Sequence, residues 1–280
     1  MNPTIQPETV VRLSPLVRRI TQNNPGLMTG PGTNTYLVGN DRLFILDPGE
    51  DTPEHFEAIR AAVGRTPVSG IAPTHAHPDH WPLAPRLAQA LGAETYGFKP
   101  LNGYEPRRLV ADGAVLRDGD WTLRALHTPG HLSDHLSYFL VEERALFSGD
   151  HVMAWSTSVI SHPDGSLTSY LASLERLLAM ELGRMYPAHG ELIEDGRARV
   201  QELIAHRQMR TAQVREALAA GPRTVSALVE RIYAGVDRRL YPAARQSVLA
   251  HLDALVASGE VRIVPDTPDD RYVLESPSGG

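Results

Sequence analysis

Four metal-ligand side chains stand close together directly after an apolar stretch of this chain. The segment THAHPDH (74–80) overlaps the end of SGIAPT (69–74), a short apolar run that predicts a buried strand. A loop that leaves a strand can direct alternate side chains to one point, and imidazole and carboxylate are suitable ligands for zinc, iron or manganese. We therefore predict a metal site here rather than a surface loop that happens to be rich in histidine. Its candidate ligands are His75, His77, Asp79 and His80.

Three further segments place a histidine or an aspartate where a predicted strand meets a loop. They contribute His131 in TPGH (128–131), Asp150 in SGDH (148–151) and His189 in PAHG (187–190). A glycine in each segment allows the backbone turn that presents the neighbouring side chain. One such motif is weak by itself, but the ordered set of four predicts a single shared site.

The composition limits the chemistry that this site can use. The 280 residues include no cysteine, which excludes disulfides, cysteine nucleophiles and iron–sulfur clusters. No run of about 18 apolar residues occurs, so we expect no membrane span. Residues 1–20 lack a basic end followed by an apolar core, so we expect no secretory signal and a cytoplasmic location.

Short strands and helices alternate over the first two thirds of the chain, which predicts sheets covered by helices in an α/β or α+β body. From Gly196 onward the pattern is helical, and Gly259 ends the last helix. EVRIV (260–264) and RYVLE (271–275) alternate apolar and polar residues and can pair as a hairpin. Three helices and a two-stranded wing describe a winged-helix module. We expect strands at 43–46, 69–74, 94–97, 121–127, 135–141 and 144–148, helices at 53–63, 81–91 and 166–180, and domains at 1–200 and 201–280.

The order H-x-H-x-D-H, then His, Asp and His, resembles the metallo-β-lactamase superfamily, particularly its glyoxalase-II-like branch, over about residues 10–195. The resemblance implies an α+β fold, with an αββα sandwich that carries two metals at one edge, followed here by a small winged-helix domain. Histidine rather than glutamate at position 77 disfavours the flavodiiron branch. By this resemblance His75, His77 and His131 hold the first metal, Asp79, His80 and His189 hold the second, and Asp150 bridges the two.

Two close metal ions imply a hydrolase. A water that bridges them loses a proton near neutral pH, and the hydroxide attacks a carbonyl or phosphoryl centre. We expect Asp79 and His80 to act at the reaction, with Asp79 also orienting the hydroxide. Two divalent ions are expected, with zinc preferred to iron and manganese, which the same ligands accept.

Four more residues are candidates for supporting roles. Asp47 ends the apolar run LFIL (43–46) and either hydrogen-bonds a metal-ligating histidine or simply forms the turn. His135 is expected to brace the site rather than to bind metal. Trp155 lies in the segment after Asp150 and is interpreted as an apolar substrate contact or as a core residue. His151 is placed at the substrate mouth, although its side chain can equally point away.

The body with its C-terminal module resembles a narrower group of β-lactamase-like hydrolases. This group includes a mitochondrial single-strand endoribonuclease of animals, and fungal thioesterases that release polyketides share the architecture. The resemblance rests on GPGTNTYLVG (30–39), HTPGH (127–131), FSGDHV (147–152) and YPAHG (186–190). Architecture therefore leaves the substrate open.

Three functions remain open. A hydrolase of small esters, thioesters or lactones is favoured by the acidic body, since residues 1–196 carry 15 Lys or Arg and 23 Asp or Glu. An endoribonuclease is favoured by seven arginines of the tail, yet residues 197–280 carry 12 Arg against 10 Asp or Glu, a weak excess for a phosphate binder. A non-enzymatic metal-sensing regulator would not need so complete a ligand set. The seven arginines are Arg207, Arg210, Arg215, Arg231, Arg238, Arg239 and Arg245.

The expected partner is a small-molecule substrate, with RNA as the alternative and no membrane. We interpret the winged helix as a cap over the active site or a homodimer contact rather than as a nucleic-acid reader.

Overall fold

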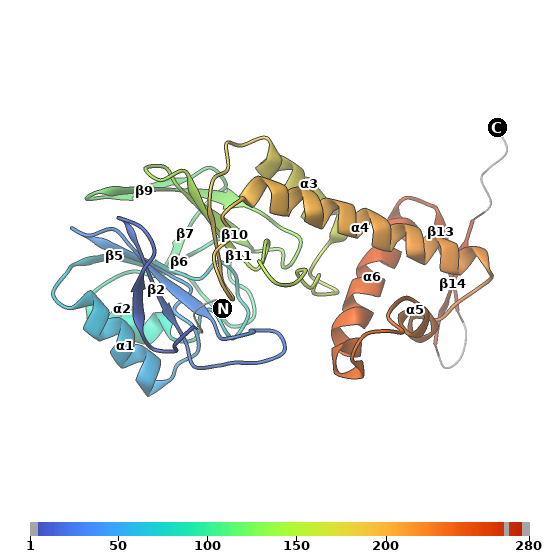
Figure 1. Ribbon diagram of the computed structural model, residues 1–280, viewed down its shortest axis with the longest axis horizontal. Helices are drawn as coiled ribbons and strands as arrows, with labels where there is room; N and C mark the ends of the chain where they lie inside the picture. Colours follow the sequence, from blue (N-terminus) through green and yellow to red (C-terminus); the bar gives the residue numbers. More distant parts are fainter. Residues whose placement is uncertain (1–4, 266–268, 276–280) are drawn as a thin grey trace.

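Two five-stranded β-sheets packed face to face form the body of the protein (Figure 1). The structure, a computed structural model, describes residues 5–265 and 269–275. Both sheets are antiparallel except for one parallel pair each, β4 with β5 and β11 with β12. The first sheet has the order β1 (Val10–Arg12), β2 (Val17–Thr21), β3 (Asn34–Val38), β4 (Leu43–Leu46), β5 (Val68–Ala72). The second has the order β12 (Met185–Pro187), β11 (Ala145–Gly149), β10 (Leu136–Leu140), β9 (Trp121–His127), β8 (Val115–Asp118).

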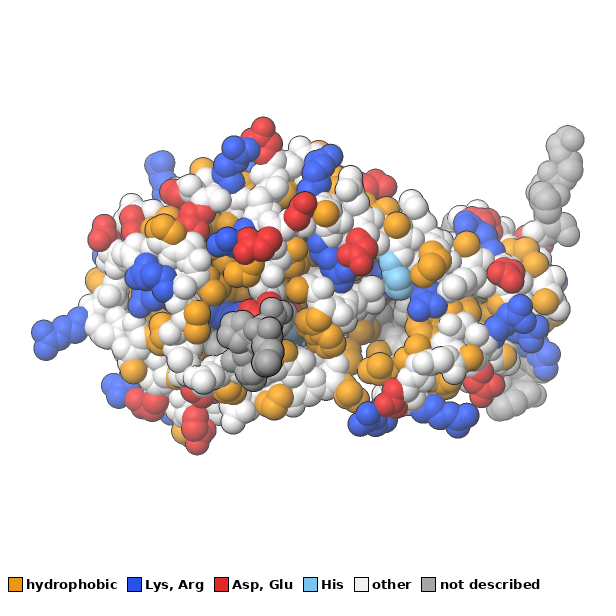
Figure 2. Space-filling model, in the orientation of Figure 1, with side chains coloured by type: hydrophobic (Ala, Val, Ile, Leu, Met, Phe, Trp, Pro, Cys, Tyr) orange, Lys and Arg blue, Asp and Glu red, His pale blue; other side chains and the backbone are white. Residues whose placement is uncertain are grey.

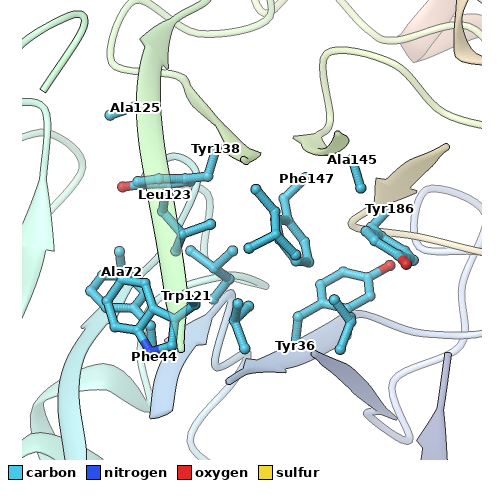
Figure 3. Close-up of a cluster of buried hydrophobic side chains, with 14 of the residues drawn as sticks. Tyr36, Phe44, Ala72, Trp121, Leu123, Ala125, Tyr138, Ala145, Phe147 and Tyr186 are labelled. Atoms are coloured by element: carbon cyan, nitrogen blue, oxygen red, sulfur yellow. The ribbon is translucent and has the colours of Figure 1, made fainter. Parts of the chain in front are cut away.

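Alternate residues along the strands supply two different cores. In β4, Phe44 joins the cluster between the two sheets, whereas Ile45 joins the cluster on the outer face of the first sheet. Aromatic rings fill the space between the sheets (Figure 3), where Tyr36 packs against Phe147 with ring centroids 5.2 Å apart. Because both faces of these strands are covered, β4 is buried along its whole length, as its uninterrupted apolar run requires.

Helices cover the outer face of each sheet. The helices α1 (Pro53–Val63) and α2 (Ala84–Leu91) pack on the first sheet, and α3 (Leu167–Leu178) packs on the second together with the start of α4 (Gly196–Ala219). The layers therefore run helix, sheet, sheet, helix. The predicted αββα sandwich and its α+β class are confirmed.

Several predicted elements are a few residues shorter in the structure, including one strand and one helix that flank the first sheet. The strand predicted at 94–97 is limited to β6 (Tyr96–Gly97), which pairs with β7 (Arg108–Leu109). The helix predicted at 81–91 begins only at Ala84, because the residues before it form a turn in which the backbone N–H of Ala84 donates to the carbonyl of Trp81 at 2.8 Å. The N–H of Leu83 donates to the carbonyl of Gly49 at 3.0 Å, which ties the end of the ligand loop to the loop that follows β4.

The C-terminal part is a winged helix, as predicted. It consists of the end of α4, α5 (Val225–Ile232), the 3₁₀ turn η1 (Arg238–Leu240), α6 (Tyr241–Ala257) and a wing of β13 (Val261–Val264) and β14 (Arg271–Leu274). Residues 266–268, within the predicted wing loop, lie outside the described residues. No helix in the described part of the chain combines the length and apolarity needed to cross a membrane.

A single long helix joins the two parts of the molecule (Figure 1). The helix α4 is continuous from Gly196 to Ala219, so the boundary expected at residue 200 falls inside it. Val200 near its start packs in the body, whereas Val214 near its end packs in the winged helix. This shared helix fixes the winged helix beside the loops that follow β11.

Candidate metal centre

The loops that follow β5, β9, β11 and β12 meet at one edge of the sandwich. All seven candidate ligands from the sequence come together there in two groups, and within each group one ligand atom per residue lies within 4.8 Å of the others. The first group is His75, His77, His131 and Asp150, and the second is Asp79, His80 and His189.

The imidazoles of the first group converge on one point. His77 Nδ1 lies 2.9 Å from both His75 Nε2 and His131 Nε2, and those two atoms are 3.2 Å apart. Tetrahedral zinc with ordinary Zn–N bonds would hold such nitrogens about 3.3 Å apart. The opposite ring nitrogen of His131 donates to the carbonyl of Val159, which leaves Nε2 with a lone pair facing the shared point.

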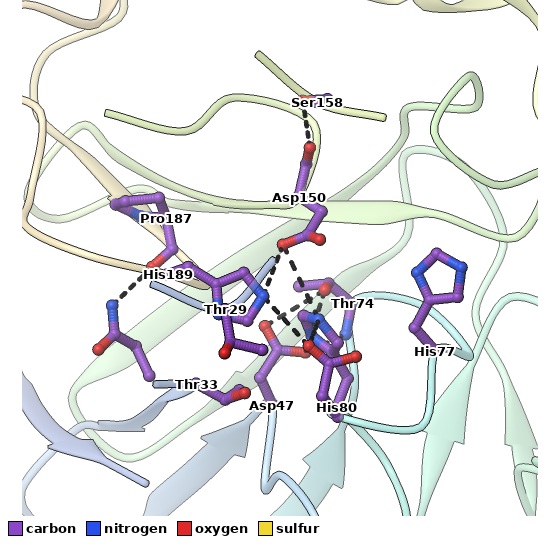
Figure 4. Close-up of polar contacts among 12 residues, drawn as sticks. Thr29, Thr33, Asp47, Thr74, His77, His80, Asp150, Ser158, Pro187 and His189 are labelled. Carbon is purple, nitrogen blue, oxygen red and sulfur yellow. Dashed lines mark hydrogen bonds and ion pairs between the residues drawn. The ribbon is translucent and has the colours of Figure 1, made fainter. Parts of the chain in front are cut away.

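Asp150 stands between the two groups. Figure 4 shows its carboxylate directed toward His80 and His189. Its Oδ1 lies 3.3 Å from His189 Nε2, whereas its Oδ2 lies 3.6 Å from His131 Nε2. Asp79 Oδ2 lies 3.3 Å from His189 Nε2 and 3.5 Å from His80 Nε2. The two oxygens of Asp150 thus face different groups, which is the arrangement that a carboxylate shared by two metals needs.

The protonation states of the first group suit metal binding. Burial, followed by the neighbouring histidines, lowers the pKa of His75, and burial together with His131 lowers the pKa of His77 to about 4. Both rings are therefore neutral at pH 7 and keep a lone pair for a metal.

In the second group, a carboxylate and an imidazole stabilise each other's charged forms. Although burial opposes both shifts, His80 lowers the pKa of Asp79 while Asp79 and Asp47 raise the pKa of His80. His80 Nε2 and Asp150 Oδ1 are buried without a hydrogen-bond partner. A divalent metal would satisfy both atoms and take the place of the proton on His80. The donor set therefore fits two divalent ions.

Asp47 contacts the ring of His80. Its Oδ1 accepts the N–H of Thr74 at 2.7 Å and lies 3.1 Å from His80 Nδ1. Asp47 has a positive φ of 48°, which is unusual outside glycine, and its side chain is buried. It therefore does more than form a turn: it ties the start of the ligand loop to one of the candidate ligands.

His135 lies behind the centre and contacts the backbone of Asp150. Its Nε2 accepts the N–H of Asp150 at 3.2 Å, and its Nδ1 lies 2.9 Å from the hydroxyl of Thr128. It belongs to neither ligand group. Gly149, with φ of 53°, leaves room for this ring, because a Cβ there would lie 2.5 Å from His135 Nε2.

The placement of His151 at the substrate mouth is wrong. Its side chain is completely buried, and its ring packs against Tyr170 with centroids 4.6 Å apart. The turn that closes with His151 N donating to the carbonyl of Ser148 points the ring inward. Trp155, in contrast, is 48% exposed and lines the cleft beside the ligands.

A cleft of about 490 Å³ opens from the two ligand groups toward the winged helix. Its walls are largely apolar, and Figure 2 shows hydrophobic side chains gathered in the depression between the two parts of the molecule. Leu27 and Met28, from the glycine-rich loop before β3, form part of its edge. Tyr233, Val236 and Leu240 of the winged helix also line it, and no sequence motif had indicated them.

Sequence comparison finds both parts of this architecture. A model of the metallo-beta-lactamase superfamily matches residues 28–189, and a model of the beta-lactamase associated winged helix domain matches residues 224–269. The first match contains all seven candidate ligands.

Fungal proteins are similar over most of the chain. A lactamase-like protein of Pestalotiopsis fici is 32% identical over 246 residues, which cover 82% of this chain and 76% of that protein. An atrochrysone carboxyl ACP thioesterase of Cryptosporiopsis sp. is 36% identical over 218 residues, which cover 75% of this chain and 65% of that protein. The chain thus spans just under two thirds of this thioesterase.

Solved structures share the whole fold. A beta-lactamase domain protein from Burkholderia ambifaria superposes with a TM-score of 0.84 at 22% identity, covering 98% of this chain and 96% of that one. A metallo-beta-lactamase family protein from Thermus thermophilus gives a TM-score of 0.80 at 24% identity, covering 94% of this chain and 100% of that one. With the superfamily match extending over more than half of its residues, the chain belongs to the metallo-β-lactamase superfamily and is a metal-dependent hydrolase.

Proposed function

We propose that this hydrolase uses two metal ions to cleave small thioesters, esters or lactones, with thioesters as the preferred class. The observation that carries the proposal is the apolar cleft of about 490 Å³ that opens directly on both ligand groups. A cleft of this size and polarity suits a small apolar acyl group. The similarity to a fungal acyl carrier protein thioesterase supports the choice of thioester.

Asp79, together with His80, is the residue that we place at the reaction. The side chain of Asp79 is 22% exposed and lines the cleft, whereas His80 lies buried behind it. Because His80 and His189 keep the pKa of Asp79 low, its carboxylate stays ionised and can orient a water toward the substrate carbonyl. Metal ions held by the two groups would lower the pKa of that water and polarise the carbonyl oxygen.

Zinc is the metal that we propose for both groups. The nitrogen spacing in the first group is close to that of tetrahedral zinc. Iron and manganese accept the same donors, so measurement of the metal content of the purified protein tests this choice.

The tail arginines give the RNA alternative little support. Arg215 forms a two-pronged pair with Glu260, and Arg239 pairs with Asp237 at 2.7 Å. Arg207 is buried. Side chains engaged in this way are poorly placed to neutralise a phosphate backbone, which requires an accessible basic face.

The deciding experiment compares two substrate classes side by side. We expect the metal-loaded protein to hydrolyse a panel of thioesters and lactones, and Asp79→Ala to lose this activity. A single-stranded RNA oligonucleotide should stay intact. RNA cleavage that is lost in Asp79→Ala, without thioester or lactone turnover, would overturn the proposal and make the winged helix a nucleic-acid module.

A further inference from the structure

Four basic side chains of α4 and α6 gather beside the cleft. They are His206, Arg207 and Arg210 on α4 and His251 on α6. Within residues 5–265 and 269–275, no ion pair joins any of them to a carboxylate. Two other arginines of α4 are paired: Arg199 with Glu202 and Arg215 with Glu260.

Arg207 is almost completely buried. It is 1% exposed, its Nη2 donates to the carbonyl of Ser158, and its Nη1 lies 3.4 Å from Ser247 Oγ. Its Nε has no hydrogen-bond partner among the residues that the structure describes. The comparably buried Arg19 instead pairs with Glu191 at 3.1 Å. A buried guanidinium without a counter-charge is costly, so the position of Arg207 calls for an anion.

The neighbouring groups leave further donors unused. Arg210 stacks over Tyr233, with its Cζ 4.5 Å from the ring centroid, and its Nε is buried without a partner. His206 Nδ1 and His251 Nε2 are also buried without partners. Burial, followed by Arg207, lowers the pKa of His206 and brings that of His251 to about 3. The local potential is therefore positive even with both imidazoles neutral.

This cluster faces the same cleft as the candidate metal ligands. His206, Arg207 and Arg210 line the cleft together with Asp79 and Asp150. Ser158 connects the two sides, because its hydroxyl donates to the carbonyl of Asp150 while its own carbonyl accepts from Arg207. Two hydrogen bonds through Ser158 thus connect Arg207 to the backbone of Asp150.

We propose that Arg207 and Arg210, with His206, form a subsite for an oxyanion carried by the substrate, either a carboxylate or a phosphate. Guanidinium groups bind such anions through paired hydrogen bonds. The inference rests on the proposed function and deepens it: the preferred thioester carries a negative charge away from the bond that is cleaved. A carboxylate would come from the acyl part and a phosphate from the thiol carrier.

The test measures kcat/KM on matched thioesters with the metal-loaded full chain. One arm compares the glutaryl thioester of N-acetylcysteamine with its neutral methyl ester. The other compares acetyl-coenzyme A with acetyl-N-acetylcysteamine. We expect the wild type to prefer the charged member of at least one pair by about tenfold or more, mainly through a lower KM. The arm that shows the preference identifies the source of the anion.

Arg210→Gln should reduce this preference to less than about threefold, and Arg207→Gln should do the same if it folds. Arg215→Gln is the matched control on the same helix and should keep it, because Arg215 is paired outside the cleft. A wild type without preference in either arm, or a preference unchanged in Arg210→Gln, would overturn the subsite.

A binding measurement separates this inference from the proposed function. Calorimetry of glutarate and of inorganic phosphate with metal-loaded wild type and Arg210→Gln needs no turnover. If no thioester is hydrolysed but either anion binds at least about fivefold more weakly to Arg210→Gln, the proposed function fails and the subsite stands. Equal affinities of both anions for the two proteins contradict the subsite.

Discussion

The cleft has one wall formed by the body and one formed by α4 and the winged helix. The two walls differ in whether carboxylates lie beside their basic side chains. On the body side, carboxylates surround the histidines: His80 has Asp47 at 3.1 Å and Asp79 at 3.5 Å. On the winged-helix side, Arg207 and Arg210 have no carboxylate among the described ion pairs. The body wall is thus suited to hold cations, and the opposite wall is suited to hold an anion.

The net charges of the body and of the C-terminal part do not reveal this difference between the two walls. The body carries the excess of acidic residues and the tail a slight excess of basic ones, but most charged side chains lie on the surface, where pairs contribute little. The two clusters beside the cleft are buried or half-buried, and a buried charge without a partner is costly. A substrate with a reactive carbonyl near the metals and a negative group farther along would complement both walls.

The largest effect is expected from a change of Asp150, the residue that the two ligand groups of the body wall share. Asp150→Ala removes the one carboxylate, among the described residues, that faces both ligand groups, so we expect loss of bound metal and a fall in kcat/KM of about a thousandfold or more. Metal analysis and turnover measure the two effects, and circular dichroism checks that the fold survives. Full activity with two metals per chain would show that Asp150 does not bridge.

A smaller effect is expected one contact farther from the metals. Asp47→Ala removes the carboxylate beside His80 Nδ1, and loss of such support typically costs about 10- to 100-fold in metal affinity. Competition with a chelator measures the affinity. Asp51→Ala, on the exposed loop that follows, is the matched control, since Asp51 pairs only with Arg86 among the described ion pairs. Equal affinities in both variants would make Asp47 a turn residue after all.

The anion-binding wall predicts a pH effect. The pKa of His251 in the folded protein is about 3, below the ordinary value of about 6.5 in the unfolded chain, so the unfolded state binds the extra proton between these values. Stability therefore falls as the pH falls through this window. Urea unfolding at pH 7 and pH 5 should show about 2 kcal/mol less acid destabilisation in His251→Gln than in the wild type. Identical losses would show that His251 is not held neutral by its surroundings.

The metal ligands could be predicted from sequence because each one lies in a loop that follows a strand. A strand end fixes where such a loop starts, so local motifs after four strands whose ends meet at one edge of the sandwich indicate one shared site. No local sequence pattern indicates that Tyr233 and Val236 line the cleft. They reach it because α4 carries the winged helix in a particular direction, and the sequence around these two residues does not reveal that direction.

Residues beside a ligand show the limit of the same reasoning. His151 follows Asp150 directly and is buried, whereas Trp155, five positions beyond Asp150, lines the cleft. The direction of each side chain depends on the turn after β11, which is closed by hydrogen bonds among residues 148–158. The cytoplasmic location, the homodimer and the substrate class stay predictions, because they depend on surroundings that the fold alone does not specify.

The smallest expected effect lies where the two walls meet. Trp155 is about half exposed at the cleft, and a Cβ on Gly190 would lie 2.8 Å from its ring, so the indole rests on the loop that carries His189. Removing this apolar surface in Trp155→Ala should raise KM about fivefold for thioesters with long or aromatic acyl groups, equivalent to about 1 kcal/mol of lost burial. Acetyl thioesters, which are too short to cover the ring, should be hydrolysed almost as before. An equal rise in KM for long and for acetyl thioesters would indicate instead that the indole supports the loop that carries His189. Trp155 would then act on the metal centre rather than on the acyl group.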